Sequence, residues 1–197
     1  MQCTQAQDVD DGNHRGQPID ESEPSEDLTF TLSDLRSNET LERKRSESQV
    51  CLPPPCADLE AYSGFISVDR WNSSEENSFL FFLYIKSKEE SQNKPLILWL
   101  QGGPGKSSLF GQFLENGPFG INASGQPYYR NHTLLNYGDI IYLDQPVGSG
   151  YSFNRRGEYN GTLEEASTHI FRFLYRFARI FPENIGKDLF IAGESYG

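Results

Sequence analysis

The feature that most constrains the fold is the segment Gly193-Glu194-Ser195-Tyr196-Gly197, which follows a strand-like run at residues 188–192. A G-x-S-x-G pattern after a strand places its serine on a sharp strand-to-helix turn, a nucleophile elbow, with the hydroxyl exposed at the rim of a sheet. The flanking glycines are needed because the turn leaves no room for Cβ atoms. The pattern therefore predicts a sheet covered by helices, with Ser195 as a nucleophile.

A second glycine-rich loop follows another buried strand. Residues 96–100 form a continuous apolar run, as expected for a strand buried on both faces, and lead into Gln101-Gly102-Gly103-Pro104-Gly105. Beside an elbow serine, the oxyanion is stabilised by the N–H of the next residue and by one N–H from such a loop. These positions are Tyr196 and the Gly102-Gly103 loop, so the two loops together predict acyl-transfer chemistry.

The remaining periodicity predicts a mixed sheet that becomes parallel along the chain. Alternating segments at residues 62–68 and 78–85 are typical of paired strands, and residues 139–143 of a further strand. Residues 107–115 have a helical pattern. The clearest helix runs from Thr162 to Pro182, with a capping box at its start. Its polar face is expected to hold Glu165, His169, Arg172, Arg176 and Arg179.

The first quarter of the chain differs in composition from the remainder. Residues 1–50 contain 12 acidic side chains, five basic ones and a single aromatic residue, Phe30. Such a segment buries too little apolar surface to offset its ordering entropy, so residues 1–55 are expected to be a disordered acidic tail or pro-segment. Leu28, Phe30, Leu32 and Leu35 are a candidate docking element within it.

Charge and cysteine content exclude several classes of protein. A net charge of −11 argues against nucleic-acid and anionic-membrane partners, and no apolar stretch is long enough to span a bilayer. Of the three cysteines, Cys51 and Cys56 allow a short disulfide loop, although the prolines between them constrain its geometry. Their spacing matches no zinc site, so neither a metal nor a cofactor is expected.

Asparagine sequons indicate a secretory-pathway protein. Five N-x-S/T sequons are present, an excess for this composition, at Asn38, Asn72, Asn122, Asn131 and Asn160. The sequence from Met1 to Gly12 shows no apolar core of a signal peptide. We nevertheless expect a glycosylated protein that is secreted or lysosomal.

Four motifs, in order, resemble the serine carboxypeptidase family of the α/β-hydrolase superfamily. Before the serine elbow come WLQGGPGKSS at residues 99–108, ENGPF at residues 115–119 and DQPVGSGYS at residues 144–152. Gln101, with Phe110-Gly111, is most similar to the vitellogenic-carboxypeptidase branch. The resemblance implies that residues 56–197 are the N-terminal part of an α/β-hydrolase catalytic domain. This part has a mixed, mostly parallel sheet with flanking helices and ends at the nucleophile elbow.

The family resemblance implies a serine-type carboxypeptidase, which releases C-terminal residues from peptides with a free C-terminus through an acyl-enzyme. Ser195 would be the nucleophile, and Gly103 and Tyr196 would donate to the oxyanion. The substrate's carboxylate would be bound by Gln101, Gly102, Glu115 and Glu194. Carboxyl groups hydrogen-bond to another acid only when some are protonated, which favours acidic pH. The resemblance also implies cis peptide bonds before Pro104 and Pro146.

The chain departs from the family pattern at several points. Lys106 stands where most members have cysteine, and Gln101 where asparagine is commoner. The triad acid and histidine of the family follow the serine, whereas His14, His132 and His169 precede it and are expected at the surface. Chain order also argues against Asp144 as the triad acid. We therefore expect these 197 residues to be inactive alone.

Two alternatives to a carboxypeptidase stay open. The chain is also compatible with a short, non-catalytic binding product, or with acyltransferase or esterase chemistry on the same fold. Glu115 and Glu194 favour the carboxypeptidase, because only that activity needs a site for a free carboxylate.

Overall fold

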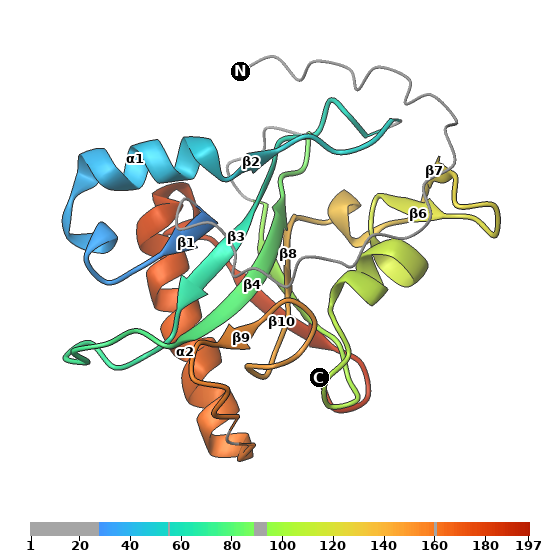
Figure 1. Ribbon diagram of the computed structural model, residues 1–197. Helices are drawn as coiled ribbons and strands as arrows, with labels where there is room; N and C mark the ends of the chain where they lie inside the picture. The colour runs from blue at the N-terminus through green and yellow to red at the C-terminus, as the bar shows by residue number, and fades with distance from the viewer. Residues whose placement is uncertain (1–27, 55, 89–93, 160) are drawn as a thin grey trace, which may run out of the picture.

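The computed structural model describes residues 28–54, 56–88, 94–159 and 161–197. Its centre is an eight-stranded sheet with the order β1-β3-β4-β8-β5-β10, to which β2 and β9 add short pairings (Figure 1). The strands are β1 (Thr29–Phe30), β2 (Gln49–Val50), β3 (Ala61–Ser67), β4 (Ser78–Ile85), β5 (Leu96–Leu100), β8 (Asp139–Leu143), β9 (Phe153–Asn154) and β10 (Leu189–Gly193).

The sheet changes from antiparallel to parallel, as the sequence predicts. β3, β4 and β8 pair antiparallel, whereas β8, β5 and β10 are parallel. The strands predicted at residues 78–85, 96–100 and 139–143 have these bounds in the structure. Since parallel strands end at one edge of a sheet, the loops after β5, β8 and β10 meet there.

Two hydrophobic clusters cover the two faces of the sheet, because successive strand side chains point to opposite sides. One contains Phe82, Phe173 and Phe177 and lies under α2 (Leu163–Ile180), beside α1 (Asn38–Glu47). The other lies under η3, a π-helix at Gly111–Asn116, next to the hairpin β6 (Phe119–Ile121) and β7 (Pro127–Tyr129). Short 3-10 helices complete the fold: η2 (Asp34–Arg36), η4 (Leu134–Asn136) and η5 (Pro182–Asn184).

Helix α2 begins as predicted but differs on its polar face. The Thr162 hydroxyl accepts a hydrogen bond from the Glu165 N–H at 3.2 Å. Arg176, expected in solvent, is fully buried. Its guanidinium donates to the carbonyls of Ser67 and Asp69, at the end of β3, and lies 5.0 Å from the Trp71 ring centre. Buried acceptors and an aromatic face replace the water that the two Nη groups lose, whereas the buried Nε has no hydrogen-bond partner among the described residues. The predicted exposure of Arg176 is therefore wrong.

The expectation of a disordered tail is wrong for residues 28–54. β1 extends the sheet by pairing with β3, and Phe30, Leu32 and Leu35 of the candidate docking element are buried in the core. Lys44 Nζ donates to Asp34 Oδ2 and to the Thr29 carbonyl, each at 2.8 Å, which joins α1 to η2 and β1. A few apolar side chains are enough to order this segment, because they pack against the apolar surface that the sheet already provides. The expectation for residues 1–27 lies outside the described residues.

We expect the Lys44→Ala substitution to lower the free energy of unfolding by about 3 kcal/mol, because it leaves a buried carboxylate without its partner. Both side chains of the Lys44–Asp34 pair are only about a tenth exposed, at 10% and 11%. The matched control is Arg43→Ala, which breaks an exposed pair with Glu47 and should cost at most about 0.5 kcal/mol. Urea denaturation measures both. Equal small losses for the two variants would contradict a stabilising role of the Lys44–Asp34 pair.

Candidate active site

The turn after β10 has the geometry of a nucleophile elbow. Ser195 has φ 58°, a left-handed conformation that a residue with a side chain adopts only when its surroundings enforce it. The Gly197 N–H donates to the Glu194 carbonyl at 2.9 Å, which closes the turn. A Cβ atom at Gly193 would overlap the backbone of Gly197, so only glycine fits there. The predicted elbow is therefore present, with Ser195 at its tip.

The glycine loop after β5 packs directly against this elbow. A Cβ atom at Gly102 would lie 2.6 Å from the Glu194 carbonyl oxygen, 2.8 Å from Ser195 Cβ and 3.0 Å from the Tyr196 nitrogen. Gly103, next in the chain, has φ 122°. Figure 1 shows the end of the chain beside this loop. The peptide bonds before Pro104 and Pro146 are cis, as predicted.

Three side chains from separate elements meet beside the serine. Gln101 is 2% exposed, and its Nε2 donates to Glu194 Oε2 at 2.6 Å and to Glu115 Oε1 at 3.4 Å. Gln101 follows β5, Glu194 follows β10 and Glu115 lies in the last turn of η3. The structure thus brings together the side chains that the sequence predicts at one site.

Trp99 is a member of this cluster that the sequence analysis missed. Its Nε1 donates to Gln101 Oε1 at 2.9 Å. Because an indole nitrogen only donates, this contact fixes the amide so that Nε2 faces the two carboxyl groups. The spacing in the sequence could have predicted this contact. Trp99 and Gln101 are two residues apart at the end of a strand, so their side chains lie on the same face.

The negative charge of Glu194 acts on the carboxyl group of Glu115. Partial burial, followed by the negative charge of Glu194 and a hydrogen bond with it, raises the pKa of Glu115. The Gln101 amide and the charge of Lys106 oppose this rise. A raised pKa keeps a proton on Glu115 at a pH where an isolated glutamate is ionised. The cluster then offers hydrogen-bond donors as well as acceptors, which suits a ligand with a carboxylate of its own.

Asp144 organises the loops instead of facing the serine. It is buried and accepts hydrogen bonds from Ser107 Oγ and the Ser108 N–H, both at 2.7 Å, and from the Tyr151 N–H at 2.9 Å. Ser108 Oγ in turn accepts from the Gln101 N–H at 3.0 Å. Asp144 therefore connects the end of β8 to the loop that carries Gln101, in agreement with the argument from chain order.

Neither of the two described histidines hydrogen-bonds to Ser195. His132 is exposed and lines a pocket of about 230 Å³ together with Glu115. His169 lies on α2, and its partial burial lowers its pKa. His14 lies outside the described residues.

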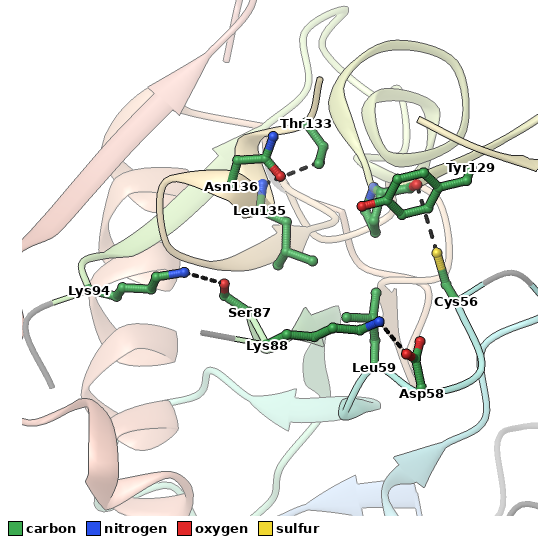
Figure 2. Close-up of a pocket in the computed structure, with 11 residues that line it drawn as sticks. Cys56, Asp58, Leu59, Ser87, Lys88, Lys94, Tyr129, Thr133, Leu135 and Asn136 are labelled. Carbon is green, nitrogen blue, oxygen red and sulfur yellow. Dashed lines mark hydrogen bonds and ion pairs between the residues drawn. The ribbon is translucent and has the colours of Figure 1, made fainter. Parts of the chain in front are cut away.

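A second pocket, of about 210 Å³, lies around Cys56 (Figure 2). Cys56 is a free, buried thiol that donates to the Pro118 carbonyl, and burial raises its pKa, which makes the thiolate scarce. Lys88 at the rim pairs with Asp58. Cys51 is disulfide-bonded, so the short loop between Cys51 and Cys56 does not form.

The predicted sequon asparagines are exposed wherever the structure describes them. These are Asn38, Asn72, Asn122 and Asn131, whereas Asn160 lies outside the described residues. Within the described ranges, no helix is long and apolar enough to cross a bilayer. The same ranges contain no group of three His, Cys, Asp or Glu side chains suited to a metal ion.

A mixed sheet with an elbow serine after β10 and a glycine loop after β5 defines the α/β-hydrolase fold. Comparison with known families identifies the group within that fold. The chain belongs to the serine carboxypeptidase family, whose model matches residues 53–197.

Individual relatives agree with this assignment. Vitellogenic carboxypeptidase from Aedes aegypti is 38% identical over 167 residues, which are 84% of this chain and 34% of that protein. The human protein named probable serine carboxypeptidase CPVL is 33% identical over 155 residues, 78% of this chain and 32% of its own length. The crystal structure of Kex1(delta)p, a prohormone-processing carboxypeptidase from Saccharomyces cerevisiae, matches with a TM-score of 0.68 and 29% identity, covering 77% of this chain and 36% of that one. The chain thus spans about a third of the length of these relatives.

Proposed function

We propose that this protein is a serine-type carboxypeptidase that releases C-terminal residues from peptides through an acyl-enzyme at Ser195. The observation that carries the proposal is the cluster of Gln101, Glu115 and Glu194 beside the elbow. An enzyme that acts on a free C-terminus needs a carboxylate site next to its nucleophile. An esterase or acyltransferase with the same elbow does not need one, so the cluster favours the carboxypeptidase over those alternatives.

Each residue near the serine has a distinct part in the proposed reaction. Ser195 Oγ attacks the last peptide carbonyl, and a general base takes its proton. The backbone N–H groups of Gly103 and Tyr196 stabilise the oxyanion that forms. The C–N bond then breaks as the base returns this proton to the departing amine, and the free amino acid leaves. Water, deprotonated by the same base, then hydrolyses the acyl-enzyme and regenerates Ser195.

The substrate's carboxylate has its own site in this scheme. It is bound by Gln101 Nε2, the Gly102 backbone and the carboxyl groups of Glu115 and Glu194, of which Glu115 carries the proton. The close approach of Gly102 to the Tyr196 nitrogen supports this assignment, because it places the carboxylate site and an oxyanion donor side by side.

We also propose that the protein is N-glycosylated in the secretory pathway and is secreted or lysosomal. The exposure of four sequon asparagines supports this proposal. The disulfide at Cys51 supports it independently, because disulfides persist in oxidising compartments.

Ser195 is expected to react covalently with a fluorophosphonate probe in the full-length protein. Ser195→Ala should abolish labelling and lower peptide cleavage by at least about 10³-fold, since the oxyanion donors alone give little catalysis. Ser167→Ala, an exposed serine on α2, is the control and should change neither. Mass spectrometry of the labelled peptide identifies the site, and a wild-type protein that stays unlabelled would contradict the proposal.

Binding of a free C-terminus is expected to weaken as the pH rises through the raised pKa of Glu115. At lower pH Glu115 carries a proton that it donates to the substrate's carboxylate, and ionisation replaces this donor by a repelling charge. KM for a blocked dipeptide should then rise by up to about tenfold per pH unit, the limit for one proton. Glu115→Gln keeps a donor without titrating, so its KM should depend less on pH. Identical pH profiles of KM for both proteins would refute this role.

Glycans are expected at Asn38, Asn72, Asn122, Asn131 and Asn160 when the protein is made in a eukaryotic secretory host. Peptide N-glycosidase should increase its electrophoretic mobility and convert the modified asparagines to aspartates, which peptide mapping detects. Replacing the asparagine of each sequon by glutamine should remove one glycan and is the control for site assignment, because it leaves Thr133 and Thr162 in place. A protein that shows no mobility change would refute the glycosylation.

A further inference from the structure

Glu115 lies on a short helix whose end needs external support. The π-helix η3 has six residues, and Glu115 is in its last turn. The last carbonyl groups of a helix lack partners within the helix, and the π form is rare and short. Since Glu115 is largely exposed, packing around its side chain contributes little to its position. Contacts made by the helix backbone therefore decide where this carboxyl group stands.

Arg130, directly after β7, supplies most of those contacts. Its guanidinium donates to four main-chain carbonyls around the end of η3, which are those of Gly117 (2.6 Å), Phe113 (3.1 Å), Phe119 (3.3 Å) and Gln112 (3.4 Å). Arginine can make these bonds because it presents five donors in a fixed plane, whereas the lysine ammonium is a single point. Its charge also lies at the negative end of the helix.

The β6–β7 hairpin is shaped around this guanidinium. A Cβ atom at Gly120 would lie 2.7 Å from Arg130 Nη2, so glycine leaves the space that the side chain occupies. Arg130 Nη2 also donates to Tyr128 Oη at 3.3 Å, and the guanidinium lies 5.6 Å from the centre of the Tyr128 ring. The guanidinium is thus held from the hairpin side as well as from the helix side.

Two further side chains hold the residue that follows Glu115. Thr133 Oγ1 donates to the Asn116 carbonyl at 2.7 Å, and Tyr142 Oη donates to Asn116 Oδ1 at 3.0 Å. These bonds, like those of Arg130, involve groups other than the Glu115 carboxyl. The carboxyl group is left to contact Gln101 and Glu194.

We propose that Arg130 is a positioning residue for recognition of the free C-terminus. It holds η3 so that the Glu115 carboxyl faces Gln101 and Glu194, and it acts through Glu115 without contacting the substrate. This inference rests on the proposed carboxypeptidase function. It predicts an effect on the selection of free acids, separate from any effect on the nucleophile.

The test is Arg130→Met in the full-length protein, assayed on a blocked dipeptide acid and on the corresponding C-terminal amide. We expect KM for the acid to rise about tenfold and the preference for acid over amide to fall equally, while kcat and probe labelling of Ser195 stay within about twofold. Arg156→Met is the matched control, because Arg156 is exposed and pairs with Glu75. It should leave KM and the preference unchanged.

A double-mutant cycle separates positioning from general stability. If Arg130 acts through Glu115, Arg130→Met should add little to the KM of Glu115→Ala, whereas independent effects would multiply. Multiplied effects would overturn the inference. If Arg130→Met does not fold, Arg130→Lys takes its place, and it should raise KM for the acid while retaining Ser195 labelling.

Failure of the inference and failure of the proposed function give different results. A wild-type protein with no preference for acid over amide would overturn both. A second result would overturn the inference alone. In it, the wild-type protein prefers the acid, and Arg130→Met keeps this preference and shows only a lower melting temperature. The carboxypeptidase proposal would then still stand.

Discussion

The candidate site depends on one backbone contact, the approach of Gly102 to the elbow at Ser195. Leu100 and Gly193 are partners in the parallel pair β5–β10, so the two loops leave the sheet at the same level. The 2.8 Å that would separate a Gly102 Cβ from Ser195 Cβ shows how closely they then pack. The register of the two strands therefore brings the candidate oxyanion donors close to Gln101 and Glu194. The backbone sets the positions of these groups, and the side-chain hydrogen bonds then fix their orientation.

Gln101 connects this backbone contact to the two carboxyl groups of the cluster. Each polar atom of its buried amide has a defined partner, since Oε1 accepts from Trp99 and Nε2 donates to both Glu194 and Glu115. A buried amide that is fully paired is held in one orientation, because any rotation would leave a buried group unsatisfied. The two carboxyl groups are thereby held close enough for the charge of one to raise the pKa of the other.

The sequence predicts what local pattern determines. Alternation, apolar runs and capping predicted β4, β5, β8 and the start of α2, and the glycine motifs predicted the elbow. The family resemblance implied the carboxylate cluster. Prediction from the sequence failed where the surroundings of a residue are formed by segments that are distant in the sequence. Arg176 looked solvent-exposed because its acceptor, the Ser67 carbonyl, is 109 residues away in sequence. Residues 28–54 looked disordered because composition does not reveal that β3 offers them an edge and an apolar face.

The position of Glu115 links the pKa of its carboxyl group to the rigidity of η3. The pKa of Glu115 is raised partly because Glu194 is near, and Coulomb interaction weakens as the two carboxyl groups separate. In the positioning role that we propose, Arg130 sets that separation through its hydrogen bonds to the carbonyl groups of Phe113 and Gly117. A change that loosens η3 would thus move the pKa of Glu115 back toward its ordinary range. If the protein is the carboxypeptidase that we propose, the rigidity of this short helix then sets the pH range in which it binds a free C-terminus.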